Sequence, residues 1–534
     1  MYSYLIRGAT LVDGSGGPPW QSDVALSGDR IGVVGPNLSV QAEQVIEGDG
    51  LVLSPGFIDI HGHSDMTLFR HPLLESKLYQ GITTEVTGNC GLGFFPVRHG
   101  GEEELARYLN IHDFSLPTGG ITWHDFSGYA ERITACGLAV NVAPLVGHAP
   151  LRMAAMGMAD RPPTAAEREQ MELLLAETLK QGAWGMSTGL IYPPGSYALT
   201  DELIALARVI HRHGALYTSH IRSESEGLMT AIGEAIAIGA ASGARVQVSH
   251  LKALGSANFG RGRELLEKLA AARGDGIDIG ADQYPYDASA TTLTAVIPAW
   301  AHAGGVECLL ERLADPALRT ELQSEINSEI ARREGADGIM ITGCHSEQNR
   351  ELSGKTVAHL ALLWNCSPAE AVIRLIREEE GNVGAIFFSM AEQDVRTILA
   401  DPLVAVGSDG HGLHPELNGA EGTHPRSYGT FPRVLGHYVR EEKILPLASA
   451  IHKMTLLPAR RLGCTDRGFI APGYVADLVL FDPDTIGDTA TYADPHHLAT
   501  GVRHLLVGGR PVLADGILTG ELPGRVLKKP GAVI

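Results

Sequence analysis

The feature that most constrains the fold is a repeated alternation of short apolar stretches with helical stretches through the middle of the 534-residue chain. Eight stretches rich in valine, isoleucine and small residues are candidate buried strands: 56–65, 82–89, 138–148, 183–190, 215–222, 245–252, 277–286 and 404–410. Helix starts lie between several of them, as in the capping-box pattern Thr164-x-x-Glu167. Eight buried strands that alternate with helices predict an α/β fold with a closed (β/α)8 TIM barrel. The alternative is a doubly wound open sheet, which is normally shorter.

Both ends of the chain carry strand patterns without helices. Residues 1–56 contain alternating apolar stretches separated by glycine-rich turns, and residues 458–534 contain matching stretches at 474–482 and 501–508. Each fragment alone would leave open sheet edges that the other one could cover. We therefore expect one small β-sandwich domain built from both termini, and a barrel domain of residues 57–457.

The seventh and eighth candidate strands are too far apart for a single crossover helix. Residues 287–345 are therefore interpreted as an insertion into the barrel domain, and most of this insertion is helical. The stretches 338–343 and 385–390 also fit strands, and either of them could replace one of the late barrel strands. We expect the insertion and the loop 410–419 to shape any pocket at this end of the barrel.

Residue types that bind metals stand at the ends of five candidate strands. In a parallel barrel these ends share one rim, so residues far apart in the sequence converge there. The residues are His61, His63, Cys90, His220, His250 and Asp409. A single histidine at a strand end is usually an ordinary polar residue. Four histidines, one cysteine and one aspartate at the same rim predict a metal site, and this ligand set suits zinc best.

Composition disfavours several other classes of protein. The net charge of −20 argues against nucleic acids and anionic membranes as partners, and no apolar stretch of about 18 residues predicts a membrane-spanning helix. Six scattered cysteines without a CxxC pair, and an N-terminus without a signal-peptide layout, predict a cytoplasmic protein. The segments Gly185–Gly189 and Ser249–Lys252 match serine-enzyme patterns, but both lie on candidate strands and are interpreted as chance matches.

The whole pattern resembles the amidohydrolase superfamily, in which a barrel with these metal-binding positions is joined to a split β domain. It is more closely similar to the N-acyl-D-amino-acid deacylases, or D-aminoacylases, and the similarity covers nearly the whole chain. The stretches that carry it are 81–91 (GITTEVTGNCG), 187–194 (STGLIYPP), 249–252 (SHLK), 284–286 (YPY) and 424–433 (HPRSYGTFPR).

The resemblance implies zinc-dependent hydrolysis of N-acyl-D-amino acids to a carboxylate and a free D-amino acid. A metal-activated water would attack the acyl carbonyl, with Asp409 as general base and then general acid. A second, weaker metal position would use His61 and His63, with Cys90 able to bridge. The ligands of the tightly held zinc would be Cys90, His220 and His250.

The resemblance further implies that Lys252, Tyr192 and Tyr284 hold the α-carboxylate of this small-molecule substrate. Lys252 stands two residues after His250, so both side chains share one face of a strand. An acidic protein needs such a cation to bind a carboxylate, and Arg433 is a further candidate for this contact.

Three other functions compete with deacylation: cyclic-amide hydrolysis as in hydantoinases, nucleobase deamination, and a non-catalytic scaffold. The hydantoinase relatives carry a lysine after the fourth strand, and residues 186–192 contain no lysine. Deamination would leave Cys90 and Lys252 without a role, and a scaffold would be expected to have lost metal ligands. The sequence leaves open whether the chain forms a homo-oligomer.

Overall fold

Eight parallel strands form a closed ring in the middle of the chain. The computed structural model describes residues 1–416 and 422–531. The ring strands are β6 (Phe57–Asp59), β7 (Ile82–Thr87), β8 (Asn141–Pro144), β10 (Gly185–Gly189), β11 (Leu216–His220), β12 (Arg245–Val248), β13 (Ile279–Gln283) and β17 (Val404–Val406). The short β9 (Val146–Gly147) continues β8 and pairs with β10. Backbone hydrogen bonds from Asp409 N–H to the His61 carbonyl and from His63 N–H to the Gly410 carbonyl close the ring. The predicted barrel fold is confirmed.

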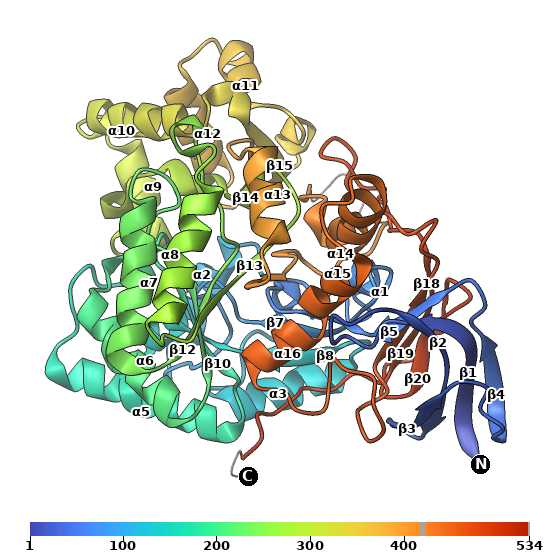
Figure 1. Ribbon diagram of the computed structural model, residues 1–534. Helices are drawn as coiled ribbons and strands as arrows, with labels where there is room; N and C mark the ends of the chain where they lie inside the picture. Colours follow the sequence, from blue (N-terminus) through green and yellow to red (C-terminus); the bar gives the residue numbers. More distant parts are fainter. Residues whose placement is uncertain (417–421, 532–534) are drawn as a thin grey trace.

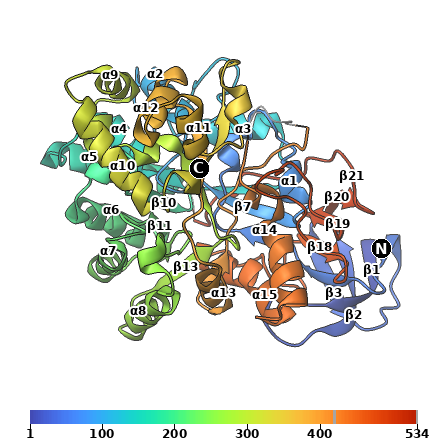
Figure 2. The ribbon, with the colours of Figure 1, turned by 90° about the horizontal axis from the view of Figure 1, so that it is seen from above.

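Helices connect the ring strands and cover the outside of the barrel (Figure 1, Figure 2). In α6, Leu203, Leu206 and Ile210 recur at spacings of three and four residues and are fully buried, which gives this helix its apolar face. Within the described residues, no helix is long and apolar enough to cross a membrane. The helices outside the insertion are α1 (Glu75–Leu78), α2 (Glu102–Asn110), α3 (Phe126–Cys136), α4 (His148–Met156), α5 (Ala165–Gln181), α6 (Thr200–Arg212), α7 (Leu228–Ser242), α8 (Gly262–Gly274), α13 (Glu392–Ala400), α14 (Arg426–Arg433), α15 (Leu447–Met454) and α16 (Leu456–Leu462), with a π-helix at Val434–Glu441.

The segment between β13 and β17 leaves the ring and builds a separate layer, which lies at the top of Figure 1. Its antiparallel sheet has the order β14 (Ser289–Thr292), β16 (Val383–Phe387), β15 (Ile339–Cys344). A core of its own joins this sheet to α9 (Val306–Ala314), α10 (Arg319–Arg332), α11 (Val357–Leu363) and α12 (Pro368–Glu378). The two ambiguous stretches 338–343 and 385–390 thus contribute to this sheet and not to the barrel. The layer therefore reaches residue 387, beyond the expected 287–345, because a strand pattern does not reveal which strand it pairs with.

Strands from both termini share one nine-stranded sheet at the side of the barrel (Figure 1). The seam between the two ends is the antiparallel pair of β5 (Val52–Pro55) and β18 (Leu478–Phe481). The other strands are β1 (Tyr2–Leu11), β2 (Trp20–Ser27), β3 (Arg30–Gly35), β4 (Ala42–Glu47), β19 (Val502–Val507), β20 (Arg510–Ala514) and β21 (Ile517–Leu518). Without β18, one edge of β5 would be uncovered, and without β5, one edge of β18 would be uncovered. Neither terminal fragment could therefore form this sheet alone.

The segment after the β domain returns to the amino edge of the barrel. Val142 forms a parallel bridge with Val526, and the Trp184 indole N–H donates to the Leu527 carbonyl at 2.8 Å. Leu527 packs against the cluster that fills this end of the ring: Ile60, Val86, Ala143, Leu145, Trp184, Leu216, Ala405 and Leu462. With the amino edge filled, the carboxyl edge is the side on which ring residues can meet a ligand.

Candidate active site

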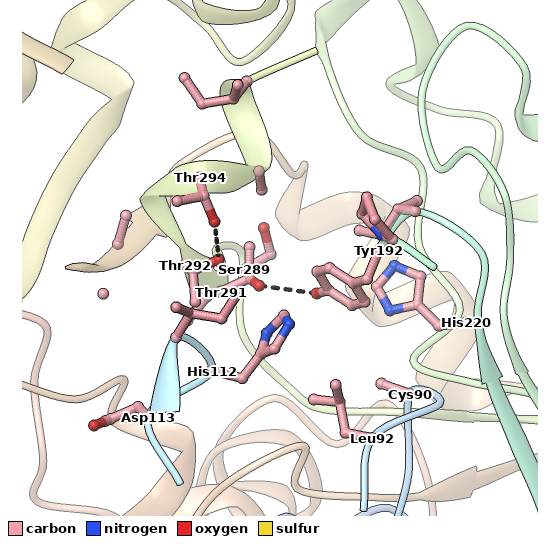
Figure 3. Close-up of a pocket in the computed structure, with 18 of the residues that line it drawn as sticks. Cys90, Leu92, His112, Asp113, Tyr192, His220, Ser289, Thr291, Thr292 and Thr294 are labelled. Atoms are coloured by element: carbon pink, nitrogen blue, oxygen red, sulfur yellow. Dashed lines mark hydrogen bonds between the residues drawn. The ribbon is translucent and has the colours of Figure 1, made fainter. Parts of the chain in front are cut away.

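A cavity of about 940 Å³ lies over the carboxyl edge of the barrel and extends beneath the insertion. The predicted residues that line it are His63, Cys90, Tyr192, His220, His250, Lys252, Tyr284 and Asp409. The insertion and the segment after α2 form the facing wall, where Thr291 and His112 point toward Tyr192 (Figure 3). Residues 417–419 of the loop 410–419 lie outside the described residues.

Cys90 lies at the centre of a buried group of imidazoles. Its Sγ atom is 3.4 Å from His61 Nε2 and 3.5 Å from His250 Nε2, and His250 Nε2 is 2.9 Å from His220 Nδ1. Burial raises the pKa of the Cys90 thiol, but the charges of His61 and His250 outweigh burial and hold this pKa well below its usual range. The thiolate that results is the form of cysteine that binds metals.

The spacing of these atoms fits a tetrahedral metal ion. One ligand atom each from His61, Cys90, His250 and Asp409 lies within 4.8 Å of all the others. Ligands bound about 2.0–2.3 Å from a tetrahedral zinc stand roughly 3.5 Å from one another, which is the separation of Cys90 Sγ from its two imidazole neighbours. Sulfur and nitrogen donors together favour zinc over magnesium or calcium.

Asp409 faces the same group from the turn after β17. Its Oδ1 atom is 3.1 Å from His63 Nε2 and 3.4 Å from His61 Nε2, and its Oδ2 atom is 2.8 Å from Arg426 Nη1. Burial opposes the charge of Asp409, but Arg426 and His61 outweigh burial and hold the pKa of the carboxyl well below its usual range. The carboxylate is therefore ionised and able to accept a proton at neutral pH.

Three residues of this group have backbone angles that side chains rarely adopt. The φ angles of Cys90, His250 and Asp409 are 54°, 38° and 49°. Each residue stands two or three positions after the end of a ring strand. Such conformations cost about 1–3 kcal/mol each and persist only where the surroundings enforce them, as they do at functional sites.

Asp282 orients two of the histidines and is not among the residues that the sequence predicts. Its Oδ1 atom accepts hydrogen bonds from His61 Nδ1 at 2.8 Å and from the His250 N–H at 2.7 Å. A carboxylate on Nδ1 holds a proton on that nitrogen, so Nε2 is the nitrogen of His61 that faces Cys90 and that could bind a metal. The only sequence signal is an acidic residue within a candidate strand.

Glu224 is a second residue that the sequence does not predict. It follows β11, and its Oε1 atom is 3.0 Å from His250 Nδ1 and in contact with Lys252 Nζ. Burial opposes the charge of Glu224, but Lys252 and then the histidines hold the pKa of its carboxyl below the usual range. Lys252 Nζ is itself 2.7 Å from His250 Nδ1, so a predicted cation lies beside a predicted metal ligand.

Arg433 is the one predicted substrate-binding residue that the structure does not place at the cavity. Its Nε donates to the Pro285 carbonyl at 2.8 Å, and its Nη1 pairs with Asp488 at 3.1 Å. Arg426 lines the cavity instead, with its guanidinium 4.8 Å from the centre of the Tyr284 ring. Both arginines belong to α14, and their spacing of seven positions places them about 10 Å apart along its axis.

The buried side chain of Lys77 fixes the backbone around Asp409 through hydrogen bonds. Its Nζ donates to Asp59 Oδ2 at 2.8 Å and to the Gly410 carbonyl at 2.9 Å. Asp59 in turn accepts a hydrogen bond from the Ser408 N–H at 2.9 Å. The ion pair therefore fixes the chain on both sides of Asp409.

The substitution Lys77→Met should lower the free energy of unfolding by about 3–5 kcal/mol, because it leaves Asp59 and Glu85 buried without a counter-charge. Chemical denaturation measures this loss. The control is Arg98→Met, which removes an exposed pair with Glu104 worth at most about 1 kcal/mol. Equal small losses in both variants would show that the Lys77 network stabilises the protein no more than a surface pair does.

Parallel barrels that gather metal ligands over the strand ends are typical of metal-dependent hydrolases, and comparison with known proteins agrees with that class. The amidohydrolase family matches residues 44–513. The N-acyl-D-glutamate deacylase of Alcaligenes xylosoxydans xylosoxydans is 38% identical over 531 residues, which cover 99% of this chain and 97% of that protein. The D-aminoacylase of the same organism is 37% identical over 531 residues, 99% of this chain and 98% of that protein.

Solved structures give the same result. The N-acyl-D-glutamate deacylase of Bordetella bronchiseptica, complexed with zinc and a phosphonate mimic of the tetrahedral intermediate, matches with a TM-score of 0.82 and 37% identity over 99% of both chains. The chain thus belongs to the amidohydrolase family, in the branch of the N-acyl-D-amino-acid deacylases. A dihydropyrimidinase from Brevibacillus agri shares the fold, with a TM-score of 0.59 and 15% identity.

Proposed function

We propose that this protein hydrolyses the amide bond of N-acyl-D-amino acids and releases a carboxylate and a free D-amino acid. One observation carries the proposal: a buried Cys–His–Asp group suited to zinc lies beside two cations, Lys252 and Arg426, that line the same cavity. The metal group suits amide hydrolysis, and the cations suit the α-carboxylate of the substrate. The family membership supports the D configuration.

We assign a tightly held zinc to Cys90, His220 and His250, and a second, weaker position to His61 and His63. In the first set, Cys90 Sγ is 3.5 Å from His250 Nε2, which is 2.9 Å from His220 Nδ1. The second set would share Cys90 and Asp409, which lie 3.4 Å from His61 and 3.1 Å from His63. Zinc bound at the first set would act as a Lewis acid on the acyl carbonyl and lower the pKa of water toward ~7.

Side chains of the protein would carry out the proton transfer and bind the substrate. Asp409 accepts a proton from the attacking water and passes it to the leaving amine, while Arg426 keeps its carboxylate ionised and in place. Lys252, Tyr192 and Tyr284 line the cavity next to His250 and His220 and hold the α-carboxylate. Arg426, rather than Arg433, provides the further cation.

A panel of N-acetyl-D-amino acids and their L enantiomers tests the proposal. We expect kcat/KM for the D series to exceed that for the L series by at least about 100-fold, because inversion at the α-carbon moves the carboxylate or the amide away from its fixed partners. The amine released is the quantity to measure. A preference for the L series would reject the assigned substrate.

Cyclic-amide hydrolysis is the alternative, and dihydrouracil and a hydantoin belong in the same panel. No lysine follows β10 in residues 186–192 to bridge two metals, and Cys90 lies at the centre instead. Turnover of a cyclic amide faster than that of any N-acetyl-D-amino acid would favour cyclic-amide hydrolysis.

The six cysteines are all free, which supports our proposal of a reducing, cytoplasmic location.

A further inference from the structure

A second group of metal-binding side chains lies at the protein surface. It consists of His99, Glu102 and His124, and none of the three lines the cavity. One ligand atom from each residue lies within 4.8 Å of the other two. The rings of His99 and His124 have their centres 4.0 Å apart, and His124 Nδ1 is 3.5 Å from Glu102 Oε1. Two imidazoles and a carboxylate therefore converge on one small volume.

Backbone hydrogen bonds bring these residues together from two parts of the chain. The Val97 N–H donates to the His124 carbonyl at 2.8 Å, which joins the segment after β7 to the residue just before the N-cap of α3. The Gly101 N–H donates to the Arg98 carbonyl at 2.9 Å and forms the turn that leads into α2. Glu102 is the first residue of this helix. The three side chains thus project from backbone that is hydrogen-bonded in place.

The polar atoms of this group have unused bonding capacity. His124 Nδ1 is buried and makes no hydrogen bond within the described residues. Hydrogen bonds from its own N–H and from the Gly100 N–H lower the pKa of the Glu102 carboxyl, so this group is a carboxylate at neutral pH. In the part of the chain that the structure describes, no arginine or lysine pairs with it, and its one ion-pair partner is His124. The position between these atoms is therefore open to a cation.

A group of similar composition beside α13 differs in this respect. Glu392, His437 and Glu442 also place one ligand atom each within 4.8 Å of the others. Arg396 pairs there with both carboxylates, at 3.0 Å and 2.6 Å, so the charge that a metal would neutralise already has a counter-ion. This second group provides a matched control for the first.

We propose that His99, Glu102 and His124 bind a zinc ion at a surface site separate from the metal group over the barrel. Two histidines and a glutamate are a known zinc ligand set, in which water takes the fourth position. The imidazoles favour zinc over magnesium or calcium, which prefer oxygen ligands alone. Because the site lacks a thiolate and its side chains are partly exposed, zinc should bind there more weakly than at Cys90 and leave in zinc-free buffer.

Zinc at this site would tie the first turn of α2 to the start of α3. The N-cap of α2 is Gly101, which has no side chain to cap the helix. Further along α2, Arg107 pairs with Glu307 of the insertion at 3.1 Å, and Tyr108 lines the cavity. Bound zinc should therefore slow the local opening of a helix that forms part of the cavity wall.

A zinc titration of the purified holoenzyme, followed by elemental analysis, tests the site. We expect the wild-type protein to take up one exchangeable zinc per chain whose affinity falls by at least about 10-fold in His99→Ala and in His124→Ala. Removing a residue that only supports a ligand already costs this much. Any zinc that His61 and His63 take up is common to all three proteins, so the difference reports the surface site alone.

The control His437→Ala should bind zinc as the wild type does, because Arg396 already pairs with the carboxylates of its group. Crystals soaked in zinc should show an anomalous peak among His99, Glu102 and His124. Hydrogen exchange of the α2 amides should slow when zinc is added to the wild-type protein, and should not change in His99→Ala.

Equal zinc affinity in the wild type and both variants would reject the site. An equal loss of affinity in His437→Ala would also reject it, because surface histidines would then bind zinc without a defined site. Zinc uptake that leaves the exchange of α2 unchanged would reject the effect on this helix. If His124→Ala does not fold, the exposed His99 still provides the test. None of these results depends on deacylase activity, so the surface site and the proposed function can fail separately.

Discussion

Asp409→Asn should lower kcat for an N-acetyl-D-amino acid by about 10²–10⁴-fold and leave the zinc content unchanged. Transfer of a proton by a positioned carboxylate contributes this much to a reaction rate. The amide keeps the shape of Asp409 and can still contact His63 and Arg426, but it cannot accept a proton from water. The tight zinc ligands that we assign do not include Asp409, so metal binding should persist.

Steady-state kinetics and elemental analysis of the same sample measure both effects. Asp488→Asn is the matched control, because Asp488 also pairs with an arginine of α14 but does not line the cavity. We expect this control to keep near wild-type turnover. Full activity of Asp409→Asn would refute the mechanism, and loss of zinc together with activity would mean that Asp409 acts mainly as a metal ligand.

Cys90→Ala should lose both the zinc and the activity. Cys90 is the one thiolate in the group, and its Sγ atom stands between His61 and His250. Removal of a residue that only hydrogen-bonds to a metal ligand already costs about 10–100-fold in metal affinity. Removal of the ligand itself should therefore cost more. Zinc per protein chain after dialysis, and turnover before and after added zinc, are the measurements.

Cys344→Ala is the control for this substitution. Cys344 is buried in β15, and burial raises the pKa of its thiol to about 12, so it carries no thiolate at neutral pH. The control should keep its zinc and its activity, although it loses a buried side chain. Retention of zinc and turnover by Cys90→Ala would show that the histidines hold the metal without the thiolate.

Much of the barrel and its metal-binding residues could be predicted from the sequence because both depend on local patterns. Alternating strands and helices have few ways to pack, and a closed parallel ring brings all carboxyl strand ends to one rim. His220, at the end of β11, and His250, just after β12, therefore met in space as expected. That convergence follows from the topology alone.

The partners of these residues could not be predicted, because they depend on how turns and loops fold back. Glu224 stands in a polar loop and Asp282 inside a strand, and neither position carries a periodic signal. Arg426 and Arg433 share one stretch and one helix face, so only the placement of α14 decides which of them reaches the cavity. The extent of the insertion depended in the same way on the pairing of β16 with β14 and β15.

The position of the zinc decides between the two sets of ligands. Anomalous diffraction at the zinc edge, from crystals of the wild-type protein grown without added metal, would locate the ion. The strongest peak should lie among Cys90 Sγ, His220 and His250. A single peak held mainly by His61 and His63, with Cys90 remote from it, would contradict the assignment.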